Sequence, residues 1–212
     1  MKKVAVILSL VFLASLPVFG SGIKLQFGPA ITSINYSEES SIPSWISKNS
    51  LFQLTGGVGF ELSFNTNLAL EVDVMYAPGG VEYKGTIMGS TITDTFKGYA
   101  VSVPILLKLS FMPGTTPYII AGGVLAYTTS QTQIIDETGA YTYHDEIDET
   151  SEVNRFQYGL VFGGGVEIAI ASMNFLIEGR YCLGLSNLIK NPMPSTESAK
   201  PNNILILVGY KF

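Results

Sequence analysis

Apolar and polar residues alternate along most of this chain, and the pattern is clearest over residues 203–212. Five apolar residues share one parity there: Ile204, Ile206, Val208, Tyr210 and Phe212. Because successive side chains of a β-strand point to opposite faces, this pattern predicts a strand with one wholly apolar face. The chain ends on an aromatic residue, which suits the lipid-facing wall of a membrane barrel better than the exposed edge of a soluble domain.

Seven further segments show a similar pattern: residues 23–32, 52–64, 68–76, 99–111, 118–128, 156–170 and 175–185. In residues 118–128 both faces are apolar or small, so the parity of that segment is ambiguous. Short turns alternate with long polar loops, and the long loops are residues 34–50, 84–96, 129–154 and 187–202. This rhythm predicts an all-β fold, an eight-stranded antiparallel up-and-down transmembrane β-barrel with both termini on the short-turn, periplasmic side.

Composition separates this prediction from a soluble lipocalin-like barrel or β-sandwich, whose strands would show the same parity with the apolar faces turned inward. Charged residues make up 14% of the chain, against about 25% in soluble domains. No uncharged apolar run after residue 20 reaches the length of about 20 residues that a membrane helix needs. The low charge therefore favours strands in a membrane.

Aromatic residues are expected to form two girdles, as in a barrel that crosses a bilayer. One group lies near the short turns: Phe64, Phe111, Tyr118, Phe175, Tyr210 and Phe212. The other lies near the long loops: Phe52, Tyr76, Tyr99, Phe156 and Tyr158. These positions support the membrane barrel over the soluble alternatives.

The first twenty residues read as a cleaved secretory signal peptide. Two basic residues, Lys2 and Lys3, precede an uncharged apolar run over residues 4–19. Small residues near the end of the run place the cut after Gly20, with Gly22 as the second choice. The expected domains are therefore a signal peptide at 1–20 and an outer-membrane barrel at 21–212.

The charged residues of the strands lie opposite the large apolar faces, which predicts a charged barrel interior. Ten residues are expected in this interior network: Lys24, Glu61, Glu71, Asp73, Lys108, Arg155, Glu167, Glu178, Arg180 and Lys211. An eight-stranded barrel is just wide enough for its side chains to fill it, so balanced charges predict a plugged lumen. Lys108 with Glu71 or Asp73 is the expected central pair. A narrow pore, or a small site for a hydrophobic ligand or lipid, remains the alternative.

The sequence offers little for catalysis or cofactors. The only histidine, His144, falls in an acidic loop, the only cysteine is Cys182, and no serine has a credible partner. No cofactor is expected, and the net charge of −5 argues against nucleic acid as a partner. A calcium site in the acidic loop, residues 129–154, stays an open alternative because calcium binds carboxylate oxygens. The prediction is a non-enzymatic protein.

Several short segments, in their order along the chain, resemble the PorT-like outer-membrane β-barrel domain family. They are residues 23–28, 76–80, 103–108, 117–122, 159–167, 178–181 and 209–212. Ala100 and Ser102 depart from the family pattern, which often has Tyr and Glu there. The resemblance implies an OmpX/OmpA-type barrel in the outer membrane and says little about chemistry.

Partners follow from this location. Outer-membrane lipid would surround the apolar faces, and the alternating pattern of residues 204–212 resembles the C-terminal signal that the outer-membrane assembly machinery recognises. Any extracellular or envelope protein partner is expected to bind the four long loops. Adhesion, partner contact and envelope support are all consistent with such a protein.

Overall fold

The computed structural model describes residues 20–37, 43, 45–87, 89–111, 116–139, 142–170, 173–191 and 198–212. The expected signal peptide lies outside these residues except for Gly20. These described residues form nine strands: β1 (Gly20–Tyr36), β2 (Ile46–Ser63), β3 (Leu68–Ile87), β4 (Ser90–Ser110), β5 (Thr116–Thr138), β6 (Tyr143–Asp148), β7 (Phe156–Ile170), β8 (Met173–Gly184) and β9 (Ala199–Lys211). In the described part of the chain, no helix has the length and apolar character needed to cross a membrane.

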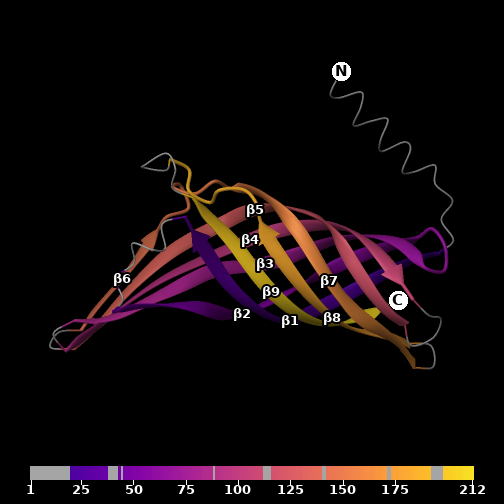
Figure 1. The fold of residues 1–212 in the computed structure, drawn as a ribbon, viewed down its shortest axis with the longest axis horizontal. Helices are drawn as coiled ribbons and strands as arrows, with labels where there is room; N and C mark the ends of the chain where they lie inside the picture. The colour runs from indigo at the N-terminus through magenta and orange to yellow at the C-terminus, as the bar shows by residue number, and fades with distance from the viewer. Residues whose placement is uncertain are drawn as a thin grey trace, which may run out of the picture.

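Eight of the strands form a closed antiparallel ring, drawn in Figure 1. Each strand pairs with its neighbour in the chain, except that β5 pairs with β7, and β9 returns to pair with β1. The predicted pairing of the last strand with the first is present, with Lys211 opposite Lys24 and Ile204 opposite Ile31. The predicted eight-stranded up-and-down barrel is thus confirmed, and closure of the ring removes both sheet edges at the level of the barrel.

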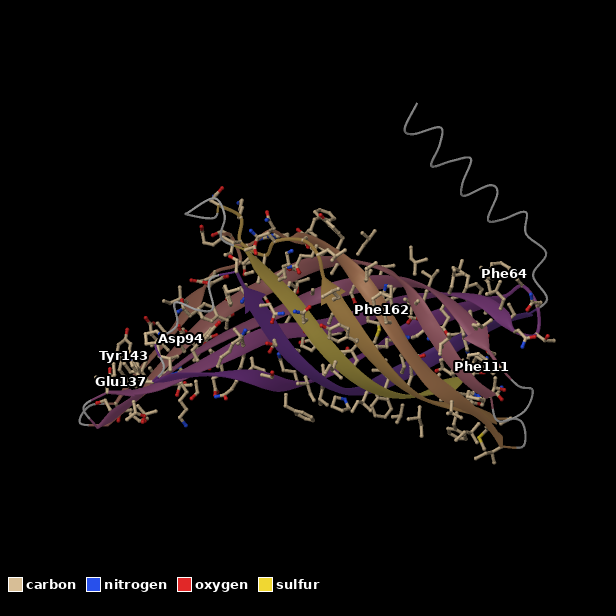
Figure 2. All side chains as sticks on the ribbon, viewed as in Figure 1. Phe64, Asp94, Phe111, Glu137, Tyr143 and Phe162 are labelled. Atoms are coloured by element: carbon tan, nitrogen blue, oxygen red, sulfur yellow. The ribbon has the colours of Figure 1, made fainter. Side chains whose placement is uncertain are left out.

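The two faces of the barrel wall differ as the alternation predicts. Large apolar side chains cover the outside, with Phe27, Leu54 and Phe156 exposed by 66%, 70% and 80%. Charged and polar side chains point inward and are buried, among them Lys24, Glu71 and Asp73. An exterior this apolar is stable only against lipid, since an exposed apolar patch of such extent is rare on soluble monomers. In Figure 2, Phe162 stands on the outside of the barrel wall.

The expected loops are corrected by β6, which lies outside the ring, and by the lengths of β3, β4 and β5. Residues 84–96 were predicted to be a loop, but β3 and β4 continue as a hairpin until Ile87 pairs with Ser90. Residues 129–154 were also predicted to be a loop, but β5 continues to Thr138 and β6 pairs with it. β-Branched residues such as those of Thr91-Ile92-Thr93 favour strand formation. Outside the membrane, a strand needs no wholly apolar face, so the sequence pattern there is weaker.

We call the part of the sheet that continues past the barrel the extended sheet: residues 46–50, 81–87, 90–98, 131–138 and 143–148. Figure 1 shows it projecting at the end of the barrel where β6 lies, while the C-terminus lies toward the other end. Register shifts occur where it leaves the barrel, between Ser50 and Gly56 in β2 and between Tyr99 and Ala100 in β4. Such bulges commonly occur at barrel rims, where they redirect strands.

Two smaller expectations concern residues near the turns and the ambiguous fifth strand. The short turn expected between segments 52–64 and 68–76 is present at residues 65–67, where Asn65 Oδ1 accepts hydrogen bonds from the backbone N–H groups of Asn67 and Leu68 at 2.8 Å. Tyr118 was expected in the outer girdle, but it points inward and is only 3% exposed. The parity of β5 therefore places Tyr118 and Ile120 inside the barrel and Ile119 outside.

Candidate functional site

Nine charged side chains fill the half of the barrel nearer the short turns. We call this group the charged plug: Lys24, Glu61, Glu71, Asp73, Lys108, Glu167, Glu178, Arg180 and Lys211. They come from β1, β2, β3, β4, β7, β8 and β9. Nine of the ten residues predicted for the interior network therefore lie together inside the barrel.

The part of the plug nearest the short turns is built on two lysines. Lys108 Nζ lies 2.7 Å from Glu61 Oε2 and also contacts Glu167. Lys211 Nζ lies 3.1 Å from Glu61 Oε1 and 2.9 Å from Glu167 Oε2. Each of the two carboxylates is thus shared by both ammonium groups, which ties β2, β4, β7 and β9 together across the lumen.

The part of the plug farther from the short turns is built on Arg180 and Lys24. Arg180 donates from Nε to Glu178, and its Nη1 lies 2.7 Å from Asp73 Oδ2. Lys24 contacts Glu71 and lies 3.4 Å from Asp73 Oδ1. Gln26 joins the group, since its Nε2 donates to Asp73 Oδ2 at 3.0 Å and its Oε1 accepts from Arg180 Nη2 at 3.3 Å. These charges are paired with one another, as buried charges must be.

Of the two expected partners of Lys108, Glu71 is present and Asp73 is not. Lys108 Nζ lies 3.6 Å from Glu71 Oε1, but Asp73 is paired with Lys24 and Arg180 instead. The register explains the difference, because Lys108 lies opposite Ala69 and is displaced from Asp73 toward the short turns. The alternation of the sequence could place both side chains in the lumen, but it could not give their positions along the barrel axis.

Arg155 is the one charged residue for which the sequence-based placement is wrong. It precedes β7, is exposed, and donates from Nη1 to the Tyr127 hydroxyl at 3.3 Å. Because it lies at the mouth of the barrel, its side chain can reach water and need not enter the lumen. With every group ionised, the plug holds four cations and five carboxylates and has an excess of one negative charge.

Tyr118 belongs to the plug region, although its place near a short turn predicted an outer girdle position. Its hydroxyl donates to Glu178 Oε2 at 2.7 Å, and Lys108 Nζ lies 4.3 Å from the centre of its ring. A Cβ at Gly165 would lie 2.7 Å from the Tyr118 hydroxyl oxygen, so this glycine leaves space for the ring. The glycine run at residues 163–165 was the sequence signal for this inward placement, because glycines leave space on the inner wall for a large side chain of the neighbouring strand.

A cavity of about 120 Å³ lies inside the barrel, beside the plug. Arg180 and Met75 line it next to the plug, and Ile34 and Leu188 line it toward the extended sheet. Most of the wall between them consists of small or apolar residues. Ile34 and Leu188 are themselves part of a buried apolar group, the rim cluster, with Val81 and Ala199. From the short turns toward the extended sheet, the interior therefore contains the charged plug, then the cavity, then the rim cluster.

The remaining predicted positions lie away from the interior. Four of the five residues of the proposed assembly signal are exposed on the barrel wall: Ile204, Ile206, Val208 and Phe212. The fifth, Tyr210, packs its ring between Phe175 and Phe212, at centre distances of 5.6 and 4.6 Å. Their lipid-facing placement matches the pattern, and their role in assembly stays a prediction.

The acidic segment lies in and around β6. His144 Nδ1 lies 2.6 Å from Asp136 Oδ1, and this hydrogen bond, together with the charge of Asp136, raises the pKa of His144 above its usual 6.5. Figure 2 labels Asp94, Glu137 and Tyr143 at this end of the molecule and Phe64 and Phe111 at the opposite end. Among the residues that the structure describes, no group of three or more His, Cys, Asp or Glu side chains has an arrangement that could hold a metal ion.

Comparison with known proteins gives a family and several similar folds. The family model described as outer membrane protein beta-barrel domain matches residues 20–190. No curated protein sequence matches the chain. Among solved structures, Ail, the attachment invasion locus protein of Yersinia pestis, is 14% identical, with 92% of this chain and 100% of that chain covered and a TM-score of 0.45.

Two further structures are similar to the same extent. OprG from Pseudomonas aeruginosa is 15% identical over 91% of this chain and 96% of its own, with a TM-score of 0.46. Neisserial surface protein A is 14% identical over 91% of this chain and 97% of its own, with a TM-score of 0.45. These identities are too low to carry an argument about function, whereas the family model spans the chain from β1 to beyond β8.

Proposed function

This chain belongs to the outer membrane protein beta-barrel domain family, and from that premise we propose that it is a non-enzymatic barrel that displays the extended sheet to a partner protein. Its place is the outer membrane, as the sequence predicts. The long connections of such barrels face the cell exterior, so the extended sheet projects outward. Adhesion and contact with another envelope or extracellular protein are the activities that this arrangement serves best.

The observation that carries the proposal is the unequal length of the strands. β3, β4 and β5 have 20, 21 and 23 residues, whereas β8 and β9 have 12 and 13. A tilted strand crosses a bilayer with about 9–11 residues. At a rise of roughly 3.3 Å per residue, the additional residues of β4 extend about 30 Å past the ends of the short strands. Membrane crossing alone does not require this length.

The extended sheet also has the edges and the charge of a binding surface. Among the described residues, no strand pairs with the outer edge of β6. Strand edges of this kind can take up a partner strand. Residues 131–152 contain seven carboxylates and neither lysine nor arginine: Asp136, Glu137, Asp145, Glu146, Asp148, Glu149 and Glu152. Electrostatic attraction therefore favours a basic protein.

The charged plug argues against the alternative of a narrow conducting pore. Its side chains reach across the lumen from opposite walls, as in the ion pair that joins Arg180 of β8 to Asp73 of β3. An ion that passed would have to separate buried pairs, which costs several kcal/mol for each charge left alone. The small-ligand alternative depends on the cavity beside the plug and is compatible with a closed lumen.

Three finer features of the sequence belong to the same proposal. We propose that the chain is a PorT-like member of the family, that residues 1–20 are a cleaved signal peptide, and that the outer-membrane assembly machinery recognises residues 204–212. The exposed side chain of Phe212, at 68%, supports the last point because an assembly factor could reach it.

A binding experiment with purified protein in lipid vesicles tests the display of a partner site. In the truncated variant, residues 133–147 are replaced by an Asn-Gly turn, which removes most of β6 and its partner segment in β5. Cytochrome c serves as a basic probe and an acidic protein of similar size as the control. We expect the wild-type protein to bind the basic probe in a salt-sensitive manner and the truncated variant to lose most of that binding.

A second deletion provides the matched control. Residues 192–197 lie in a different connector, and their removal should leave probe binding unchanged. Heat-modifiable gel mobility verifies that each variant is folded. Equal binding of the basic probe to the wild-type and the truncated protein would contradict the proposal.

Deletion of Phe212 tests the assembly role separately. The expected result is a several-fold lower yield of heat-modifiable protein in the outer-membrane fraction, because the terminal aromatic of the last strand is missing. Replacement of exposed Phe156 by Ala, at the opposite rim, is the control and should leave the yield near wild type. An unchanged yield after deletion of Phe212 would remove this role.

A further inference from the structure

The cavity beside the charged plug has the properties of a ligand site. We propose that it binds a small, uncharged and mainly apolar molecule that carries one hydrogen-bond donor, in the manner of a phenol or a short alcohol. The site is distinct from the extended sheet and needs no partner protein. It is closed on one side by the plug, so it would hold its ligand rather than conduct it.

The volume and the wall of the cavity set the size and polarity of the ligand. An engineered protein cavity of about 150 Å³ lined by apolar side chains binds benzene, and the cavity here has about 120 Å³. Its wall includes Ala100, Pro104, Val124, Ala126 and Leu205. A ligand of single-ring size with a largely apolar surface therefore fits this space.

The charges next to the cavity exclude an anion. Arg180 lines the cavity, but its guanidinium is already bonded to Glu178, Asp73 and Gln26. The plug as a whole has one more carboxylate than cation. A ligand carboxylate would thus be desolvated with no free cation to pair with, which is unfavourable.

One polar atom in the cavity wall selects for a donor. Asn203 lines the cavity, and its Nδ2 donates to the Pro78 carbonyl oxygen at 3.3 Å. Its Oδ1 is buried and accepts no hydrogen bond from the residues that the structure describes. Buried acceptors of this kind are normally satisfied, and leaving one without a partner costs about 1–3 kcal/mol. A ligand hydroxyl would satisfy Asn203 Oδ1 while its ring contacts the apolar wall.

The neighbouring groups keep such a ligand in place. The plug closes the side toward the short turns, and Ile34 and Leu188 of the rim cluster line the side toward the extended sheet. Both are made of buried, well-packed side chains. The cavity is partly open, so a ligand can enter it without disturbing the plug, whereas passage through the plug would require breaking ion pairs.

Fluorine NMR of para-fluorophenol with the protein in lipid nanodiscs tests the proposal. A bound signal, separate from the signal of probe dissolved in lipid, is expected for the wild-type protein. Fluorobenzene lacks the donor and should bind about tenfold more weakly, the effect of one buried hydrogen bond. Para-fluorobenzoate should give no bound signal. Equal binding of all three probes, or no bound signal for para-fluorophenol, would overturn the proposal.

Variants locate the bound probe. Ala126→Phe places a ring in the cavity and should abolish the bound signal, whereas Ala121→Phe, on the exposed face of the same strand, should leave it intact. Asn203→Leu should weaken para-fluorophenol about tenfold and leave fluorobenzene unchanged. Gel mobility verifies folding of each variant. If Ala126→Phe folds and still gives the bound signal, the probe lies elsewhere and the cavity is not the site.

Discussion

The barrel and the extended sheet are made of the same strands, but different forces determine their sequences. Within the barrel, β4 alternates strictly between buried and exposed positions from Pro104 to Leu109. In the extended sheet, the same strand has a mixed pattern, with Ile92 exposed and Asp94 half-buried. Lipid penalises a charge on the outer face by about 2–4 kcal/mol at mid-membrane, whereas water imposes no such penalty. Strict alternation therefore marks membrane depth rather than strand structure as such.

The two regions also differ in what their charges do. The charges of the plug are mostly buried and mutually paired, and those of the extended sheet are half-buried or exposed. Removal of one member of a buried pair leaves the other without compensation, whereas exposed ion pairs contribute little. Substitutions in the plug should therefore affect stability, and substitutions in the extended sheet should affect binding.

The largest effect is expected at Arg180. Its replacement by Ala leaves Asp73 and Glu178 without their closest cation and should lower the free energy of unfolding by about 3–5 kcal/mol. Arg155→Ala is the matched control, since that exposed arginine should contribute less than about 0.5 kcal/mol. Urea unfolding in lipid vesicles, followed by gel mobility, measures both. Similar stabilities for the two variants would contradict the paired interior.

A smaller effect is expected at Tyr118. Tyr118→Phe retains the ring over Lys108 but removes the hydrogen bond to Glu178, which should cost about 1.5–3 kcal/mol because the acceptor is charged and buried. Tyr143→Phe in β6 removes an exposed hydrogen bond to Asp145 and should change stability by less than about 0.5 kcal/mol. The same unfolding measurement applies. An equal loss in both variants would remove the distinction between the two regions.

The smallest effect concerns pH and the extended sheet. Asp136 raises the pKa of His144, so the protonated histidine is favoured in the folded hairpin of β5 and β6. The resulting stabilisation is fully present below about pH 6.5 and is lost as the pH rises through the folded pKa. Amide exchange in β6, expressed as protection factors, should therefore show greater protection at pH 6 than at pH 8.

His144→Gln provides the control for that measurement. The variant should have the same protection factors at both pH values, and the barrel strands should show no difference between the proteins. A wild-type hairpin whose protection is independent of pH would show that the contact of His144 with Asp136 does not contribute in solution.

Most of the barrel was predictable, because the cost of charge in lipid imposes a pattern that parity reveals. The alternation alone is sufficient to place Lys24, Glu71 and Lys211 inside the barrel. Their pairing partners could not be predicted, since the register of neighbouring strands decides which charges lie at the same level along the barrel axis. Tyr118 was missed because small residues on both faces of β5 hide its parity, and Arg155 was misplaced because a residue at the mouth can turn toward water.

The extended sheet was missed for a related reason. Its residues are polar and lack an alternating apolar face, which is also the pattern of a loop. The β-branched residues near Thr91 were the available signal for strand structure, but propensity is weaker evidence than alternation. The sequence indicated the cavity only as an alternative, because its volume depends on how Ala100, Ala126 and Leu205 pack around Asn203.

Conductance of the wild-type protein in a planar lipid bilayer tests the plugged barrel most directly. The interior ion pairs predict that inserted protein gives no steady current at moderate voltage. The Arg180→Ala variant, where it inserts and remains folded, should show at most brief and small openings because eight other charged side chains still fill the lumen. Stable, well-resolved single-channel currents from the wild-type protein would contradict the plugged interior.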